Sequence, residues 1–102
     1  MTLDNILEEI KKAETIVILA HETPDGDAIG SCLAMKVALK QLGKNADVII
    51  REIPKIFDFL PSREEVKKDS EIEKYDLAIS LDCADLKRLV GKEYFEEAKQ
   101  QL

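Results

Sequence analysis

Four side chains of the types that bind metal ions lie at two points of the chain, each point directly after an apolar run. His21, Asp25 and Asp27 fall within seven residues after one such run, and Asp82 directly follows another. Three carboxylates and one imidazole suit Mn²⁺, with Mg²⁺ or Zn²⁺ as alternatives, and the set contains no thiolate for a softer metal. Gathered at one place, these residues would form a metal site.

The chemistry expected of such a site is phosphoryl transfer. Close carboxylates repel one another and raise each other's pKa, and a divalent ion relieves that repulsion. One carboxylate, such as Asp82, could bridge two ions roughly 3.5–4 Å apart, the spacing that supports attack of an activated water on phosphorus. A helix that begins at Ala28 would add its positive end to the same anion site.

Each residue taken alone also has a purely structural explanation. The Asp25-Gly26-Asp27 sequence could be a turn followed by a helix cap. His21 could be a partly buried histidine bonded to backbone, and Asp82 could cap the turn after its strand. The joint placement of all four at two strand ends favours the metal site.

The hydrophobic pattern predicts the elements that must position these residues. Strands are expected over 15–20, 46–50 and 76–81, and helices over 2–13, 28–42 and 93–102. This alternation favours a single three-layer α/β/α domain, residues 1–102, with a small parallel sheet. Right-handed crossovers allow the strand order 2-1-3. The ends of the first and third strands would then be neighbours, which brings Asp82 beside His21.

Two of the predicted helices have apolar residues that should face the sheet. In 28–42 these are Ala28, Ile29, Cys32, Leu33, Met35, Val37, Leu39 and Leu42. Gly43 is a natural stop for that helix. In 93–102 the expected inward residues are Tyr94, Phe95, Ala98 and Leu102.

Residues 51–74 have a less regular pattern. Pro54 and Pro61 bracket four apolar residues, which we expect to form one helical turn under the core: Ile56, Phe57, Phe59 and Leu60. Nine of the twelve residues in 63–74 are charged, which indicates a solvated loop or a short surface helix.

Composition limits the possible functions. The net charge of −6 argues against a module that binds nucleic acid by charge alone, because phosphate binding needs a basic surface. The longest apolar run is too short to span a bilayer, so no membrane association is expected. Cys32 and Cys83 lie in apolar contexts, which favours buried thiols in a cytoplasmic protein, although a disulfide is possible.

Two segments together resemble a known family. AHETPDGDAIGS (20–31) and LDCADLKRL (81–89) resemble the first two motifs of the DHH-family phosphoesterases, in the branch of nano-RNases and phosphoadenosine-phosphate phosphatases. The FLP sequence at 59–61 also fits that branch. The resemblance implies that His21, Asp25 and Asp27 are metal ligands and that Asp82 is the bridging ligand. Asp85 and Arg88 match a supporting acid and base of the second motif, and the alternative for them is an ordinary surface ion pair at i, i+3.

The family's Asp-His-His triplet is absent, since His21 is the only histidine. A fourth-motif aspartate and a C-terminal substrate-binding domain are absent too. The sequence therefore resembles the amino-terminal portion of a larger enzyme, an incomplete DHH-type domain. One metal site could form from His21, Asp25 and Asp82, whereas the second would lack its histidine, so the two-ion site would be incomplete.

The expected function is hydrolysis of short oligoribonucleotides or 3′-phosphorylated nucleotides with Mn²⁺, Mg²⁺ being possible. Asp82 and Asp27 would be the catalytic residues, and this chain alone would be inactive or weakly active. One alternative is a non-catalytic metal-binding or interaction module whose exposed sheet edge supports homodimerisation or strand exchange. Nucleotide binding without hydrolysis is another, but neither a GxGxxG nor a P-loop pattern is present.

Overall fold

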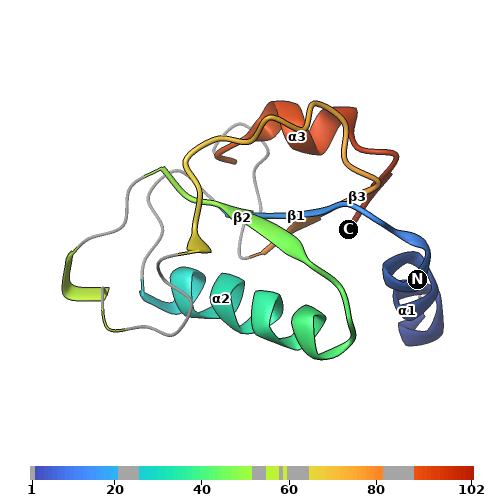
Figure 1. The fold of residues 1–102 in the computed structure, drawn as a ribbon, viewed down its shortest axis with the longest axis horizontal. Coiled ribbons are helices and arrows are strands. Elements are labelled where there is room, and N and C mark those ends of the chain that lie inside the picture. Colours follow the sequence, from blue (N-terminus) through green and yellow to red (C-terminus); the bar gives the residue numbers. More distant parts are fainter. Residues whose placement is uncertain (1, 21–25, 52–54, 58, 60–64, 82–88) are drawn as a thin grey trace.

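Four short parallel strands in the order β2-β1-β3-β4 form the centre of the protein (Figure 1). The computed structural model describes residues 2–20, 26–51, 55–57, 59, 65–81 and 89–102, with the side chains of 26, 27 and 57 outside the description. Its elements are α1 (Leu3–Lys12), β1 (Ile16–Leu19), α2 (Gly26–Gln41), β2 (Ala46–Ile49), the 3₁₀ turn η1 (Lys55–Phe57), β3 (Leu77–Ser80), α3 (Lys92–Glu97) and β4 (Gln100–Gln101). The predicted α/β class and the order 2-1-3 of the first three strands are confirmed.

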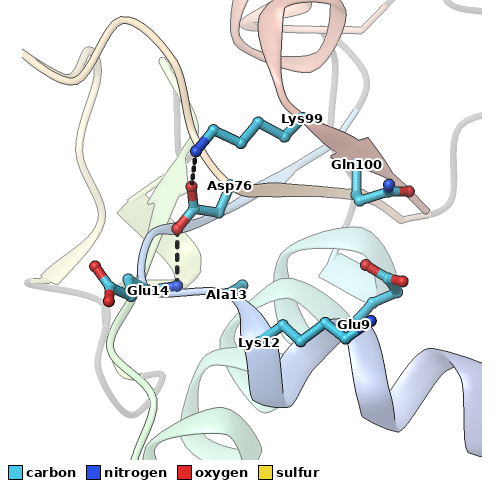
Figure 2. Close-up of a pocket in the computed structure, with 7 residues that line it drawn as sticks. All are labelled: Glu9, Lys12, Ala13, Glu14, Asp76, Lys99 and Gln100. Carbon is cyan, nitrogen blue, oxygen red and sulfur yellow. Dashed lines mark hydrogen bonds and ion pairs between the residues drawn. The ribbon is translucent and has the colours of Figure 1, made fainter.

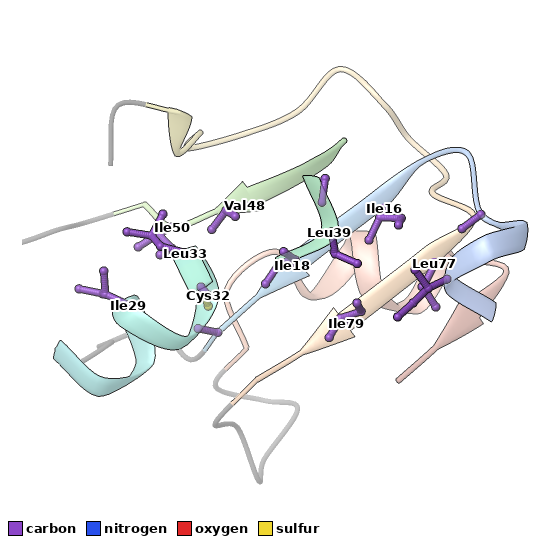
Figure 3. Packing of buried hydrophobic residues seen from close by; sticks show 14 residues of the cluster. Ile16, Ile18, Ile29, Cys32, Leu33, Leu39, Val48, Ile50, Leu77 and Ile79 are labelled. Atoms are coloured by element: carbon purple, nitrogen blue, oxygen red, sulfur yellow. The ribbon is translucent and has the colours of Figure 1, made fainter. Parts of the chain in front are cut away.

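Strand β1 is buried on both faces, which explains its uninterrupted run of β-branched and aliphatic residues. Ile16 and Ile18 face α2, within the core cluster shown in Figure 3. Val17 and Leu19 belong to a second cluster on the opposite face, beneath α3. Helices α2 and α3 thus cover opposite faces of the sheet (Figure 1), which confirms the predicted three layers.

A reciprocal clamp fixes the register of β1 against β3 at their amino ends. The Asp76 carboxylate accepts hydrogen bonds from the backbone N–H of Glu14 at 2.9 Å and of Thr15 at 3.3 Å. In return, the Thr15 hydroxyl accepts the backbone N–H of Asp76 at 2.9 Å. Lys99, which precedes β4, makes an ion pair with Asp76 at 3.2 Å (Figure 2). These bonds lower the pKa of Asp76, the Glu14 N–H contributing most.

Helix α2 ends as its sequence predicts. Gly43 adopts a left-handed φ of 81°, and the N–H of Lys44 bonds back to the carbonyl of Leu39 at 2.8 Å, which closes the last turn. The apolar face is narrower than expected, because Val37 is 37% and Leu42 60% exposed. No helix in the described part of the chain is long and apolar enough to cross a membrane.

The turn η1 forms where the sequence predicts one helical turn. Two of the four apolar residues that were expected to pack under the core are exposed instead. Ile56 is 74% and Phe59 77% exposed. The space beside β2 is filled instead by the chain around Lys67, whose backbone bonds to Val48 and Ile50 at 2.9 and 3.0 Å. The prediction was therefore wrong for Ile56 and Phe59, while Leu60 and the side chain of Phe57 lie outside the described residues.

The helix predicted over 93–102 is correct only for its first part. Helix α3 ends at Glu97, Ala98 is extended, and the chain then pairs with β3 as β4. The N–H of Leu102 donates to Ala78 and its carbonyl accepts from Ser80. Tyr94, on α3, is buried against the sheet, whereas Leu102 packs on the opposite face. The open edge of the described sheet is consequently β4.

A polar network fastens the segment before β3 to the α3 face. The buried Tyr75 hydroxyl lies 2.6 Å from both Asp47 Oδ2 and Ser70 Oγ. Because a carboxylate only accepts, Tyr75 donates to Asp47 and receives the Ser70 proton. Tyr94 bonds to the backbone N–H and C=O of Ser70 at 2.9 and 3.1 Å. Burial, and then the bond to Asp47, raise the pKa of Tyr75.

Candidate metal centre

The carboxyl ends of β1 and β3 meet at one edge of the sheet. Leu19 is opposite Ser80 in the register, and the N–H of Leu81 donates to the carbonyl of Leu19 at 2.9 Å. Residues 20 and 81 thus come directly after two neighbouring parallel strands. Ligands of open α/β sheets bind at this kind of edge.

The chain returns to the same point after residues 82–88. Leu89 is buried, and the N–H of Val90 donates to the carbonyl of Ala20 at 3.0 Å. The segment 82–88 is therefore bounded at both ends by hydrogen bonds to the last two carbonyls before His21. This arrangement anchors the second motif to the start of the first.

Helix α2 begins on the same side, because a helix that follows a parallel strand starts near that strand's carboxyl end. In Figure 1 the amino end of α2 and the carboxyl end of β2 lie on the same side of the molecule. The macrodipole of α2 favours an anion at this end. The edge thus carries a positive helix end, as phosphate binding would require.

The predicted ligands His21, Asp25 and Asp82, together with Asp85 and Arg88, lie outside the described residues. Asp27 is in the first turn of α2, and its side chain also lies outside the description. Among the described residues there is no group of three or more His, Cys, Asp or Glu that could hold a metal ion. The ligand assignments therefore stay predictions.

Two contributors to this edge were not predicted. Gly91 has a left-handed backbone, φ 75° and ψ 28°, and its carbonyl accepts the N–H of Tyr94 at the start of α3. Arg51, after β2, binds Asp69 at 3.0 Å and Glu93 at 3.2 Å, and the bond to Asp69 is the main cause of its raised pKa. A glycine directly before a helix is a capping signal, whereas nothing in the sequence pairs Arg51 with Glu93.

A surface cavity of about 530 Å³ lies at the opposite end of the sheet, where the strands begin. It is lined by the carboxyl end of α1, by the residues that lead into β1, and by Asp76 and Lys99 (Figure 2). Asp76 is already engaged by backbone N–H groups and by Lys99. This cavity therefore does not compete with the carboxyl edge as the candidate metal centre.

Comparisons with known proteins agree with the fold and with the two motifs. The family model "DHH family, N-terminal domain" matches residues 15–102. The bifunctional oligoribonuclease and PAP phosphatase NrnA of Thermus thermophilus is 40% identical over 88 residues, which cover 84% of this chain and 27% of that protein. The crystal structure of an exopolyphosphatase-related protein from Bacteroides fragilis superposes with a TM-score of 0.79 at 29% identity, covering 88% of this chain and 29% of the other.

The chain thus spans less than a third of the length of either protein. The expected resemblance to an amino-terminal portion of a DHH phosphoesterase is confirmed. The identity over 84% of this chain and the TM-score of 0.79 point to the same family as the family model does. The chain belongs to the DHH family, whose N-terminal domain model it matches over residues 15–102.

Proposed function

We propose that this chain supplies a divalent-metal site for hydrolysis of phosphate esters. The observation that carries the proposal is the pairing of β1 with β3: Leu81, directly after β3, donates its N–H to the carbonyl of Leu19, the last residue of β1. Ala20 and Leu81 directly follow these two strands, and consecutive Cα atoms are about 3.8 Å apart, so each of the two motifs continues from a residue at this edge. This supports convergence of His21 and Asp82 on one cation.

The donor chemistry fits such a cation. His21, Asp25, Asp27 and Asp82 offer one imidazole and three carboxylates, which suit Mn²⁺ and, with the oxygen donors dominant, Mg²⁺. When bound, a divalent ion of this kind neutralises charge on phosphate oxygens and acidifies a bound water. Asp82 would be the bridging ligand and Asp27 its catalytic partner, with Asp85 and Arg88 in support.

The substrates that we propose are short oligoribonucleotides or 3′-phosphorylated nucleotides. They are suggested by the name of the Thermus thermophilus protein, an oligoribonuclease and PAP phosphatase. The amino end of α2 would attract the phosphate, because the chain's overall charge of −6 does not. With a single histidine and no Asp-His-His triplet, this chain alone should turn over slowly or not at all.

A calorimetric titration with Mn²⁺ tests the metal site, and Asp82→Ala is the informative variant. We expect wild-type chain to bind Mn²⁺ and the variant to lose most of that binding while it keeps its circular dichroism spectrum. Asp4→Asn, on the exposed first turn of α1, is the matched control because it removes one negative charge far from the edge. Equal Mn²⁺ affinity in wild type and Asp82→Ala would refute the assignment.

A second candidate function is an interaction module that pairs through its sheet edge. The observation in its favour is β4, a two-residue outer strand of exposed glutamines on the described sheet. Such a module should form dimers or exchange strands at micromolar concentration. Light scattering coupled to size exclusion separates the two, and Mn²⁺-dependent release of nucleotide from a short RNA would favour the enzyme.

A further inference from the structure

The return of the chain to the end of β1 depends on one unusual residue. Gly91 is buried and left-handed, and it directly follows Val90, whose N–H donates to the carbonyl of Ala20. Ala20 in turn is bonded covalently to His21, the first predicted metal ligand. Any displacement at Gly91 is therefore passed through one hydrogen bond to the start of the first motif.

A side chain does not fit at this position. A Cβ on Gly91 would lie 2.9 Å from Leu19 Cδ2, closer than real Cβ atoms approach, and 3.0 Å from Tyr94 Cδ2, tighter than nine in ten real Cβ contacts. Neither neighbour can move easily, because Leu19 is fully buried in the sheet and the Tyr94 ring is held by its hydroxyl bonds to Ser70. The strain would be relieved by moving the backbone of 90–91 away from β1.

We propose that Gly91 is a positioning residue for the metal centre, holding Val90 against Ala20, the residue that precedes His21. The proposal rests on the proposed function, since it concerns the same site. Gly91 touches neither metal nor substrate: it acts through the Val90–Ala20 hydrogen bond. This hydrogen bond joins the residue after the second motif to the residue before His21.

The chain contains a matched control for this glycine. Gly43 has nearly the same backbone conformation, φ 81° against 75°, but a Cβ there would meet nothing within 4 Å. It lies after the carboxyl end of α2, away from the metal edge. Gly43→Ala thus carries the cost of a left-handed alanine without the collision and without the site.

The test compares Mn²⁺ affinities of wild type, Gly91→Ala and Gly43→Ala by calorimetry, at a temperature where circular dichroism shows all three folded. Gly91→Ala should weaken Mn²⁺ binding by about 10- to 100-fold, as loss of an outer support of a metal site does. Gly43→Ala should bind as wild type does. The amide of Val90 should exchange faster only in Gly91→Ala, whereas the Leu81 amide stays protected in both.

A second substitution that removes the contact between the added Cβ and Leu19 should restore part of the Mn²⁺ binding. Leu19→Val removes the δ-methyl nearest to the added Cβ, so Gly91→Ala should weaken Mn²⁺ binding less in the Leu19→Val background than in wild type. This double variant also replaces Gly91→Ala in the comparison if the single variant does not fold.

The outcomes separate the two proposals. Absence of Mn²⁺ binding by wild type refutes the proposed function. Binding by wild type with unchanged affinity in Gly91→Ala refutes the positioning role alone. Equal weakening in Gly91→Ala and Gly43→Ala also refutes it, because left-handed strain would then suffice as the explanation.

Discussion

Removing the hydroxyl of Tyr75 should destabilise the protein by more than the loss of an ordinary tyrosine hydroxyl. Tyr75→Phe keeps the ring, which is fully buried, and deletes two contacts of 2.6 Å to Asp47 and Ser70. Asp47 is the important partner, because its carboxylate then loses one of its donors. Lys67 remains bound to the other carboxylate oxygen at 3.0 Å.

The size of the expected loss of stability follows from the negative charge of Asp47. Hydrogen bonds to charged groups contribute about 1.5–3 kcal/mol, and the retained Lys67 contact places this one near 2 kcal/mol. For a domain of this size, each kcal/mol lowers the melting temperature by about 4–8 °C, so we expect a decrease of roughly 8–16 °C. Tyr94→Phe loses bonds only to the backbone of Ser70, which is uncharged, and should cost about 1 kcal/mol.

Urea denaturation of wild type, Tyr75→Phe and Tyr94→Phe measures these differences, with thermal unfolding as a second probe. The two variants are matched, since each deletes one hydroxyl from a ring of the same edge-to-face pair. If Tyr75→Phe is no less stable than Tyr94→Phe, the assignment of the Tyr75 proton to Asp47 is wrong.

Three further variants test other parts of the fold. Asp76→Asn should lose less stability on acidification than wild type. The folded-state pKa of Asp76 is lowered, so the stabilisation by its carboxylate is fully present above the ordinary carboxyl pKa of about 3.9. That stabilisation disappears as the pH falls through the lowered pKa. Parallel pH titrations of unfolding free energy check this, and identical slopes would contradict it. Leu39→Ala should cost about 2–5 kcal/mol, since Leu39 is 1% exposed. Leu42→Ala should cost about 0.5 kcal/mol or less, since Leu42 is 60% exposed, and equal urea midpoints would contradict the observed helix orientation.

The sheet was predictable because its strands are short apolar runs in a chain of alternating helices and strands. Ile16 to Leu19 are all buried, so no other position in the sheet would suit them as well as the centre. Helix α2 was predictable for the same reason, down to its stop at Gly43. The exposed Leu42 shows where periodicity fails, because it comes after the last residue of the helix, whereas Leu39 in the last turn is buried.

The rest depends on contacts between residues distant in the sequence. Leu102 fits both a helix face and a strand, and only pairing with Ala78 and Ser80 decides between them. Ile56 and Phe59 are exposed because another segment, near Lys67, occupies the edge of β2. For the candidate site, the sequence predicted which strand ends meet, whereas the hydrogen bond from Val90 to Ala20 had no signal in it.

The most direct test of the central claim is where a bound Mn²⁺ broadens backbone amide signals in an NMR spectrum. Each strand residue adds about 3.3 Å along the sheet, so a cation at the carboxyl edge is much nearer to Ala20 and Leu81 than to Ile16 and Leu77. We predict that substoichiometric Mn²⁺ broadens the first two signals together and leaves the other two sharp. Broadening that affects only one of Ala20 and Leu81, or is strongest at Ile16 and Leu77, would contradict a metal centre shared by β1 and β3.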